Sequence, residues 1–361
     1  MNNFYIVDLE YIESRYTAQW KTELPKYLKE KLPQFNINVI EGNDVPQMVT
    51  PGAFLNFGGT TVYKAQQIEK IARLFCEDKI QDGDQFLFTD FWHPGILFLK
   101  YMSTLLGKKI ETHGLIHAGS YDKNDFLGRV ENKSWLQQTE LAMFEAFDHT
   151  YFATCYHYDL FCDTFFDYPA SVEHIISGKV RFTGWLFDFI KPAIQQDIVG
   201  IEKENIIVFP HRLAPEKQYW TFLKLKEALP EFEFVTCQDK KLSKKEYHRL
   251  LGRAKIVWSA SLQETLGIST CIEGPIAGCI PLAPNDLSYR EIFQGTPFVY
   301  NSAFVRNEES FDDRIEFFKT LIRDIMINYD SWKVNLDRYV EEVIPEYGSF
   351  ESFVGEFTTT H

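Results

Sequence analysis

Short apolar runs typical of buried β-strands alternate with longer amphipathic segments along almost the whole chain. In the first half, the runs 3–9, 36–42, 53–59 and 84–90 read as strands, and the segment 62–80 carries apolar residues at helical spacing. Parallel strands need a long crossover between them, whereas antiparallel strands can be joined by a tight turn. The alternation therefore predicts an α/β fold whose parallel sheets are covered by helices on both faces.

The alternation restarts with the strand run 205–210, after a connecting stretch at 180–194. A chain of 361 residues is long for one core and suits two domains. We predict two doubly wound, Rossmann-like domains facing each other across a cleft, over residues 1–184 and 185–340. The segment 341–361 is expected to return to the N-terminal domain.

Composition and charge narrow the class of protein. The N-terminal segment carries Asp8 and Glu10 where a secretory signal needs an apolar stretch, and no apolar run is long enough for a membrane span, so a cytoplasmic protein is expected. The six cysteines include no C-x-x-C pair, which indicates neither a disulfide framework nor a zinc site. A net charge of −14 argues against general attraction to polyanions.

Polar residues directly after two strands of the second half are the strongest functional candidates, because ligands of open α/β sheets bind beyond the carboxyl ends of strands. His211, Arg212 and Lys217 follow the strand 205–210. Two cations near the start of a helix suit a diphosphate, although an ordinary solvated loop would carry the same residues.

Glu264, Gly267 and Glu273 follow the next such strand, which ends at Trp258. Glycine lets backbone amides approach a ligand closely, and a carboxylate can accept hydrogen bonds from two adjacent sugar hydroxyls. Capping of the following helix is the alternative role for Glu264.

The stretches "PHRLAPEKQYW" and "SASLQETLGISTCIEG" resemble the donor half of the GT-B glycosyltransferases of family 4, with their R-x4-K pair and E-x7-E signature. Through the combination of P-H-R, the E-x-x-G turn, G-C-x-P-L and N-D-L-x-Y-x-E-I-F, the chain is within that group most similar to tRNA-queuosine mannosyltransferases over residues 205–300. A phage-type DNA glycosyltransferase is a related possibility. The resemblance implies donor-binding roles for several residues. The diphosphate pair is Arg212 and Lys217, with His211 beside it; Glu264 faces the donor sugar, Gly267 and Ile268 present amides, and Glu273 holds the nucleoside ribose.

The chain departs from this signature at one point, because eight residues rather than seven separate Glu264 from Glu273. One extra residue turns a helical position by about 100°. Either the helix begins one residue later or Glu273 is not the ribose ligand, and alignment from Glu273 through Gly278 to Pro281 favours the first.

The N-terminal half is expected to supply the acceptor site. Asp90 and His93 are placed just past one strand, and His113, His117 and Asp122 just past the next; Arg15 and Tyr16 follow the first strand. His117 resembles a histidine that the family places near the donor sugar, and His113 is the other candidate for that position. A metal pair formed by the two is disfavoured, because Gly114 at a strand end argues against the helix such a pair needs.

The resemblance implies that the sugar is transferred with retention, and a UDP- or GDP-sugar is the expected donor. No metal or further cofactor is expected, because no carboxylate pair stands out on a loop ready to bind a metal. Arg212, Lys217 and helix dipoles then stabilise the charge on the leaving group. The resemblance to enzymes that modify a tRNA base implies an acceptor hydroxyl on a modified nucleobase of DNA or tRNA. Aromatic residues, which reach 16%, suit the stacking of such a base. Candidate stacking residues are Phe91, Trp92, Tyr121 and Phe126. A cell-envelope glycan or small metabolite is the alternative acceptor, and an inactive nucleotide-sugar-binding protein is the alternative of another class.

Overall fold

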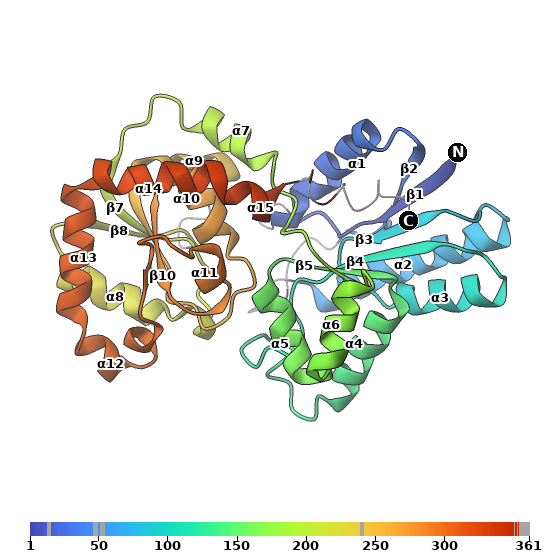
Figure 1. Ribbon diagram of the computed structural model, residues 1–361. Helices are drawn as coiled ribbons and strands as arrows, with labels where there is room; N and C mark the ends of the chain where they lie inside the picture. The colour runs from blue at the N-terminus through green and yellow to red at the C-terminus, as the bar shows by residue number, and fades with distance from the viewer. Residues whose placement is uncertain are drawn as a thin grey trace. The chain divides into compact units, whose positions relative to one another are not determined.

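The computed structural model describes residues 1–12, 16–45, 50, 55–238, 242–349, 351 and 353. The chain forms two compact units (Figure 1). The first comprises Met1–Ala153, Tyr158–Leu186 and, near the C-terminus, Glu351 and Phe353. The second comprises Thr154–His157 and Phe187–Ser349.

In the part of the chain that the structure describes, the first unit contains a six-stranded parallel sheet in the order β2-β1-β3-β4-β5-β6. The strands are β1 (Asn2–Val7), β2 (Phe35–Ile40), β3 (Gln85–Phe88), β4 (Glu111–Leu115), β5 (His149–Phe152) and β6 (Val180–Phe182). All residues of the central strand β3 are buried, as expected where helices cover both faces of a sheet.

The helices of the first unit lie on both faces of this sheet (Figure 1). They are η1 (Tyr16–Gln19), α1 (Trp20–Lys31), α2 (Phe57–Cys76), α3 (Gly95–Leu105), α4 (Ser134–Ala146), α5 (Cys155–Phe165) and α6 (Tyr168–Ile176). Helices α2, α3 and α4 pack side by side on one face, and α1 covers the other, as right-handed crossovers require. Aromatic side chains such as Phe86, Phe88, Phe144 and Phe147 fill the core.

The second unit contains a five-stranded parallel sheet, again among the described residues, in the order β11-β10-β9-β7-β8. The strands are β7 (Glu204–Phe209), β8 (Glu233–Thr236), β9 (Ala254–Trp258), β10 (Ile280–Pro284) and β11 (Val299–Tyr300). The helices are α7 (Ile190–Asp197), η2 (Pro215–Lys217), α8 (Tyr219–Ala228), α9 (Lys244–Arg253), η4 (Ile268–Glu273), α10 (Gly274–Ile276), α11 (Leu287–Ile292), η5 (Ser302–Val305), α12 (Glu308–Asp312), α13 (Ile315–Ile327), α14 (Tyr329–Glu342) and α15 (Ile344–Gly348). Helices α8 and α13 pack on one face, and α7, α9, α10 and α14 on the other.

The strand orders place one switch point in each sheet. In the first sheet the chain leaves β1 toward β2 on one side and later adds β3 on the other. In the second sheet β7 has β8 on one side and β9 on the other. The two connections at a switch point diverge to opposite faces, which leaves a ligand-accessible crevice at the carboxyl ends of those two strands.

One predicted strand and the predicted C-terminal segment have different bounds in the structure. The run 53–59 was expected to be a strand, but Phe57–Gly59 form the first turn of α2, and the Asn56 side chain caps that helix by accepting the Gly59 N–H at 2.8 Å. Residues 53 and 54 lie outside the described residues. In addition, 341–349 belong to the second unit, where the Gly348 carbonyl accepts the Phe187 N–H at 3.2 Å.

Lys203, just before β7, donates hydrogen bonds to the C-terminal ends of two helices at the amino edge of the second sheet. Its ammonium donates to the carbonyls of Leu251, Ala254 and Ala277 at 3.0, 2.6 and 2.7 Å. Ala254 and Ala277 are the C-caps of α9 and α10, whose carbonyls have no partner within their own helices. Lys203→Met keeps the aliphatic stem but removes the three bonds, so we expect the free energy of unfolding to fall by about 2 kcal/mol.

Denaturant unfolding of Lys203→Met beside Lys333→Met checks this expectation. Lys333 is an exposed lysine that pairs with Asp337 four residues along α14. Its loss should cost at most about 0.5 kcal/mol, as for other exposed helix pairs. Equal losses for the two variants would contradict the role given to Lys203.

Candidate functional site

The loop after β7 holds the two cations predicted to bind an anion. The chain leaves β7 through His211 and Arg212 and then forms the short turn η2. Arg212 makes an ion pair with Glu216, whose side chain is 2% exposed. Glu216 was not singled out in the sequence, although it lies four residues after Arg212, a spacing at which side chains on one helical turn meet.

Four contacts bind this loop to the loop after β9, the neighbouring strand at the switch point. Lys217 Nζ donates to Glu264 Oε2 at 2.9 Å and to the Gln263 carbonyl at 2.6 Å. The Leu262 N–H donates to the Glu216 carbonyl at 2.7 Å, and Gln218 Nε2 donates to the Ala260 carbonyl at 2.6 Å. The structure therefore brings Arg212, Lys217 and Glu264 together at the switch point of the second sheet.

The cations of this site are matched by carboxylates. Arg212 faces Glu216, and Lys217 faces Glu264. The exposed fraction is 8% for the Lys217 side chain and 18% for that of Glu264. An anionic ligand would therefore bind to ammonium and guanidinium groups that are already held in place, which reduces the entropic cost of ordering them on binding.

His211 lies between these cations and the helix that follows Gly267. Its ring is buried, and Nε2 lies 3.4 Å from Thr270 Oγ1. Burial, followed by the charges of Lys217 and Arg212, holds the pKa of His211 well below its ordinary value. His211 is therefore neutral, and it connects the loop after β7 to the turn that carries Glu273.

Gly267 begins that turn in a conformation that favours glycine. Its φ of 75° lies in the left-handed region, and a Cβ placed there would lie 2.8 Å from Tyr289 Cε1 and 3.1 Å from Glu264 Cγ. The close packing brings the backbone of Gly267 beside the Glu264 side chain. Ile268, half-buried, is the first residue of the helical turn that follows.

The extra residue between Glu264 and Glu273 is accommodated by a π-helical turn. Residues Ile268–Glu273 form η4, in which the Gly274 N–H donates to the Ser269 carbonyl five residues earlier. An i→i+5 bond encloses one residue more than the α-helical i→i+4 bond. The sequence left two alternatives, a helix that starts one residue later or a Glu273 that is not the ribose ligand. In the structure the turn is wider instead. The extra residue therefore does not rotate the residues after it by the about 100° of one helical position.

Glu273 lies inside this unit with its carboxylate bonded on both oxygens. Oε1 pairs with Lys244 at the start of α9, and Oε2 accepts the Tyr247 hydroxyl at 3.1 Å and the Ser269 hydroxyl at 3.3 Å. Burial raises the pKa of Glu273, but Lys244, His248 and Tyr247 together lower it by more than burial raises it. The pKa of Glu273 therefore lies below its ordinary value. Glu273 thus links the turn after β9 to the helix after β8.

The predicted acceptor-side residues are dispersed over the first unit. Asp90 follows β3 and pairs with Lys64 at 2.6 Å. His93 is fully buried, with Nε2 3.0 Å from Gln67 Oε1, and burial lowers its pKa to about 3. Asp122 is buried and accepts the Asn124 N–H at 2.9 Å in a local turn.

His117 follows β4, as predicted, and is half-buried. Its Nε2 donates to the Thr89 carbonyl at 2.8 Å, and its ring packs 4.9 Å from Trp185 and 5.6 Å from Trp20. Arg15 lies outside the described residues; Tyr16 begins η1, and its side chain is likewise not described.

The predicted stacking residues divide into two pairs. Phe91 and Tyr121 are buried in the core of the first unit, whereas Trp92 and Phe126 are only half-buried. Trp92 Nε1 donates to Glu140 Oε1 at 3.1 Å, and Phe126 stacks on Phe57 with ring centroids 5.5 Å apart. Of these four predicted residues, Trp92 and Phe126 are the two with surface to offer a flat ligand.

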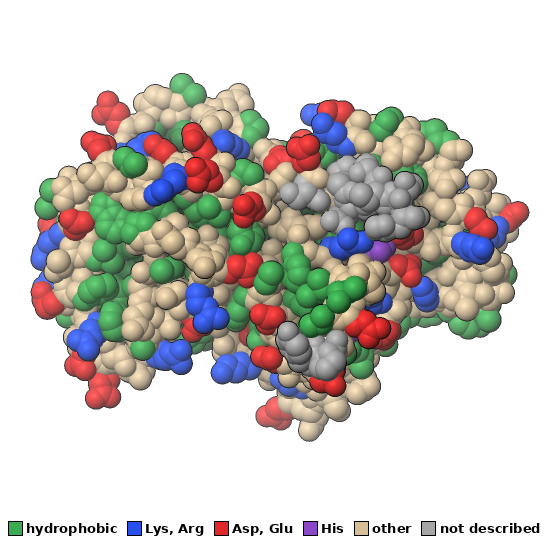
Figure 2. All heavy atoms as spheres, viewed as in Figure 1, with side chains coloured by type: hydrophobic (Ala, Val, Ile, Leu, Met, Phe, Trp, Pro, Cys, Tyr) green, Lys and Arg blue, Asp and Glu red, His purple; other side chains and the backbone are tan. Residues whose placement is uncertain are grey.

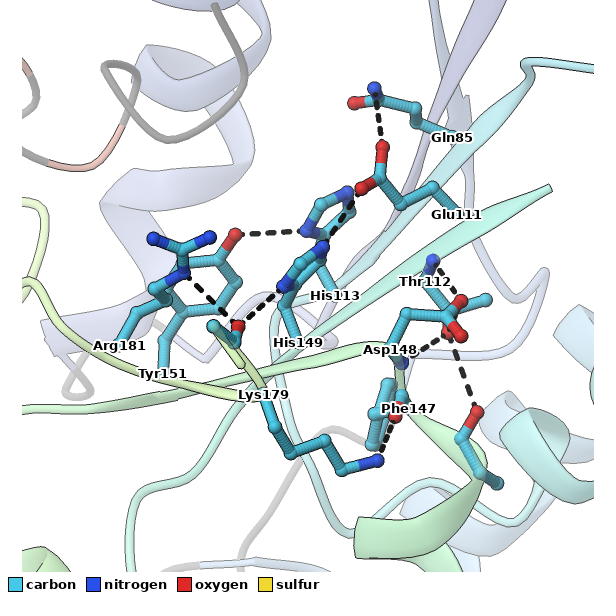
Figure 3. Close-up of polar contacts among 12 residues, drawn as sticks. Gln85, Glu111, Thr112, His113, Phe147, Asp148, His149, Tyr151, Lys179 and Arg181 are labelled. Carbon is cyan, nitrogen blue, oxygen red and sulfur yellow. Dashed lines mark hydrogen bonds and ion pairs between the residues drawn. The ribbon is translucent and has the colours of Figure 1, made fainter. Parts of the chain in front are cut away.

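His113 does not lie past the strand, as the sequence predicted, but inside β4 (Figure 3). Both faces of β4 are covered by helices, so a residue inside this strand is buried whichever way its side chain points. Its Nδ1 lies 2.8 Å from the Tyr151 hydroxyl, and its ring stacks on His149 with centroids 5.1 Å apart. Burial lowers the pKa of His113 to about 3. These contacts give His113 a structural position in the sheet.

His149 beside it faces two acceptors. Nδ1 lies 2.7 Å from the Gly178 carbonyl and Nε2 2.8 Å from Glu111 Oε1, so both nitrogens must carry protons to donate (Figure 3). Burial lowers the pKa of His149, but Glu111 and Gly178 raise it by more, so the pKa lies above the ordinary 6.5. Arg181 opposes this charge, and Glu111, whose pKa is lowered chiefly by His149, stays ionised.

A folded-state pKa above the unfolded one stabilises the protein below the unfolded value, and the contribution is lost as pH rises through the folded value. We therefore expect the free energy of unfolding of the wild type to exceed that of His149→Gln most below pH 6.5. The difference should shrink above that pH. His113 stays neutral over this range, so it does not confound the comparison. A difference that grows with pH would contradict the charged state of His149.

The switch point of the first sheet holds polar residues that sequence reasoning did not assign. Asp8 Oδ2 pairs with Lys21 at 2.8 Å and Oδ1 accepts the Tyr63 hydroxyl at 2.7 Å. Glu10 accepts the Thr60 hydroxyl at 2.7 Å, and Lys64 pairs with Asp90. The sequence did carry a signal for these residues, because Asp8 and Glu10 follow a buried strand closely.

Across the described residues, no helix is long and apolar enough to cross a membrane. No cluster of three or more His, Cys, Asp or Glu side chains in the described ranges is arranged to hold a metal ion.

The sequence matches no known family model and no curated protein. Solved structures resemble the fold of this chain over nearly its whole length. HepE of Anabaena, in complex with UDP and glucose, aligns with a TM-score of 0.62 at 10% identity, covering 100% of both chains. The fold is GT-B. Sucrose-phosphate synthase of Thermosynechococcus elongatus aligns with a TM-score of 0.61 at 10% identity over 99% of this chain and 98% of that one.

A glycosyltransferase of Rickettsia africae also aligns, with a TM-score of 0.58 at 15% identity over 99% of this chain and 97% of the other. At such low identities the likeness is one of fold. The more specific resemblance to tRNA-queuosine mannosyltransferases stays a prediction.

Proposed function

We propose that the protein is a glycosyltransferase that takes a sugar from a nucleoside diphosphate sugar. One observation carries this proposal: Arg212, Lys217, Glu264 and Gly267 meet at the switch point of the second sheet. Such a crevice binds nucleotides in other doubly wound sheets. The GT-B fold shared with glycosyltransferases supports the same reading.

Each donor-side residue has a role in this proposal. Arg212 and Lys217 bind the diphosphate and stabilise its charge as the sugar departs, a preorganised electrostatic contribution. Glu264 accepts hydrogen bonds from hydroxyls of the sugar, and the amides of Gly267 and Ile268 lie beside it. Glu273 accepts hydrogen bonds from the ribose hydroxyls. His211, which is neutral, keeps the first loop against the helical turn.

The stereochemistry and acceptor rest on the sequence resemblance. We propose retention at the anomeric carbon without a metal, the acceptor hydroxyl giving its proton to the departing phosphate. His117 is assigned to the acceptor side, near the transferred sugar. The donor is a UDP- or GDP-sugar.

For the acceptor we propose a hydroxyl on a modified nucleobase of DNA or tRNA. The resemblance of residues 205–300 and the exposed surfaces of Trp92 and Phe126 support it. The charge distribution limits how such an acceptor would bind. On the face shown in Figure 2, the described Lys and Arg side chains lie interspersed with Asp and Glu. With the net charge of −14, this mixing of charges predicts few phosphate contacts, and hence a shallow dependence of acceptor binding on salt.

Release of nucleoside diphosphate from a panel of UDP-, GDP- and ADP-sugars tests the donor half of the proposal. Each donor is assayed alone, with hydroxymethylated DNA and with tRNA. Release that rises with one nucleic acid supports the acceptor assignment. Release from a donor alone that neither nucleic acid increases retains the use of a nucleotide sugar and overturns the acceptor. Binding of a donor without any turnover would indicate a nucleotide-sugar-binding protein.

A further inference from the structure

Lys244 stands in an electrostatically unfavourable place for a lysine. It is the first residue of α9, where the unpaired backbone N–H groups and the helix dipole favour negative charge. The capping box of this helix, formed by Ser243 and Glu246, follows that rule. Lys244 does not, and the partner that compensates for its position is the buried carboxylate of Glu273.

The contact of Lys244 with Glu273 is shielded from water. The Glu273 side chain is 3% exposed and that of Lys244 32%, and the Lys244 ammonium lies 5.3 Å from the centroid of the Tyr247 ring. Tyr247, three residues along α9, donates its hydroxyl to the other oxygen of the same carboxylate. Side chains from one turn of α9 thus contact both carboxylate oxygens of Glu273.

We propose that Lys244 is a positioning residue, which holds the Glu273 carboxylate in the orientation that accepts two adjacent hydroxyls of a nucleotide ribose. This inference rests on the proposed function, in which Glu273 is the ribose ligand. Lys244 acts through Glu273 and does not itself touch the nucleotide.

The acceptor capacity of the carboxylate supports this division of roles. A carboxylate offers about four lone-pair positions. Lys244, Tyr247 and Ser269 occupy three of them, and the Ser269 contact is the longest at 3.3 Å. A ribose diol takes the open position and that of Ser269, while Lys244 and Tyr247 keep the carboxylate from turning.

Paired nucleotides with and without the ribose hydroxyls test the inference. Uridine diphosphate and its 2′,3′-dideoxy form, with the guanosine and adenosine pairs as further probes, are titrated calorimetrically into the full-length protein. We expect the wild type to prefer the ribose form at least about tenfold, the effect of hydrogen bonds to a charged group. Lys244→Met should remove most of that preference, and Lys244→Arg, which keeps the charge, should retain it.

Lys245→Met is the matched control, because Lys245 is the exposed neighbour on the same turn, and it should leave the preference unchanged. If Lys244→Met does not fold, as judged by its melting temperature, Glu273→Gln replaces it and should show the same loss of preference. An unchanged preference in these variants overturns the inference, as does equal weakening of both nucleotide forms by Lys244→Met, which would mean direct contact with the nucleotide. A wild type that binds UDP without any preference also overturns it but leaves the donor site standing. A wild type that binds no nucleotide overturns the proposed function, and this inference with it.

Discussion

Lys217→Met is expected to reduce the rate constant of sugar transfer at least about 100-fold, as when other enzymes lose one preorganised donor to a developing anion. The physical reason is the position of the Lys217 ammonium. The Lys217 side chain is 8% exposed, and its ammonium is held by the Gln263 carbonyl and Glu264, so water cannot readily replace it. The measurement is the rate of nucleoside diphosphate release at saturating donor and acceptor.

Two controls separate loss of the charge from loss of structure. Lys226→Met removes an exposed lysine from α8 in the same unit and should leave the rate unchanged. Lys217→Met also leaves Glu264 without its cation, so Lys217→Met/Glu264→Gln removes both charges together. If that double variant recovers the wild-type rate, Lys217 serves only to neutralise Glu264, and its role at the diphosphate is wrong.

Arg212→Ala should lower the rate at least about tenfold for the same electrostatic reason.

Gly267→Ala is expected to lower the free energy of unfolding by about 2–5 kcal/mol. A left-handed backbone costs a residue with a Cβ about 1–2 kcal/mol, and forcing an extra methyl group into a packed site adds about 1–3 kcal/mol. The new methyl group would lie within 2.8 Å of the buried Tyr289 ring. Chemical denaturation with the two-state analysis measures the loss.

Gly295→Ala provides a matched control for this variant. Gly295 has the same φ of 75°, but no atom lies within 4 Å of the position of its Cβ. This variant should lose only the backbone contribution, about 1–2 kcal/mol. Equal losses at the two positions would show that the packing around Gly267 is not what requires glycine there.

The site after β7 and β9 is electrically balanced before any ligand binds. Arg212 and Lys217 face Glu216 and Glu264, and Lys244 faces Glu273. This balance suits a chain of net charge −14, because it keeps cations at fixed positions without a basic surface. A diphosphate donor would then be recognised by geometry more than by long-range attraction.

The fold was largely predictable because the alternation of apolar runs and helical segments appears in local sequence. The strand run 205–210 and the strand predicted to end at Trp258 correspond to β7 and β9 of the second sheet. The run 53–59 failed because a short apolar stretch with two glycines does not distinguish a strand from the start of a helix. What decided it was the Asn56 cap, a contact between side chain and backbone that apolar periodicity does not encode.

The candidate site was predictable to a different degree in the two halves. In the second, Arg212, Lys217 and Glu264 could be found because they directly follow strands. Glu216 had only a spacing signal, and Lys244 had none, since its partner is 29 positions away. In the first half, His113 was misplaced by a few residues along β4, which is enough to move a side chain from a loop into the core.

By itself, the sequence determined the two α/β halves and the cations and glutamates that follow the strands of the second, because these depend on periodicity and on residue type at strand ends. Only the tertiary structure decided that β7 and β9 are neighbours at a switch point, which brings Lys217 to Glu264. It also decided that a π-turn absorbs the extra residue before Glu273. Strand order and a widened helical turn arise from packing between distant segments, and one-dimensional spacing carries no record of that packing.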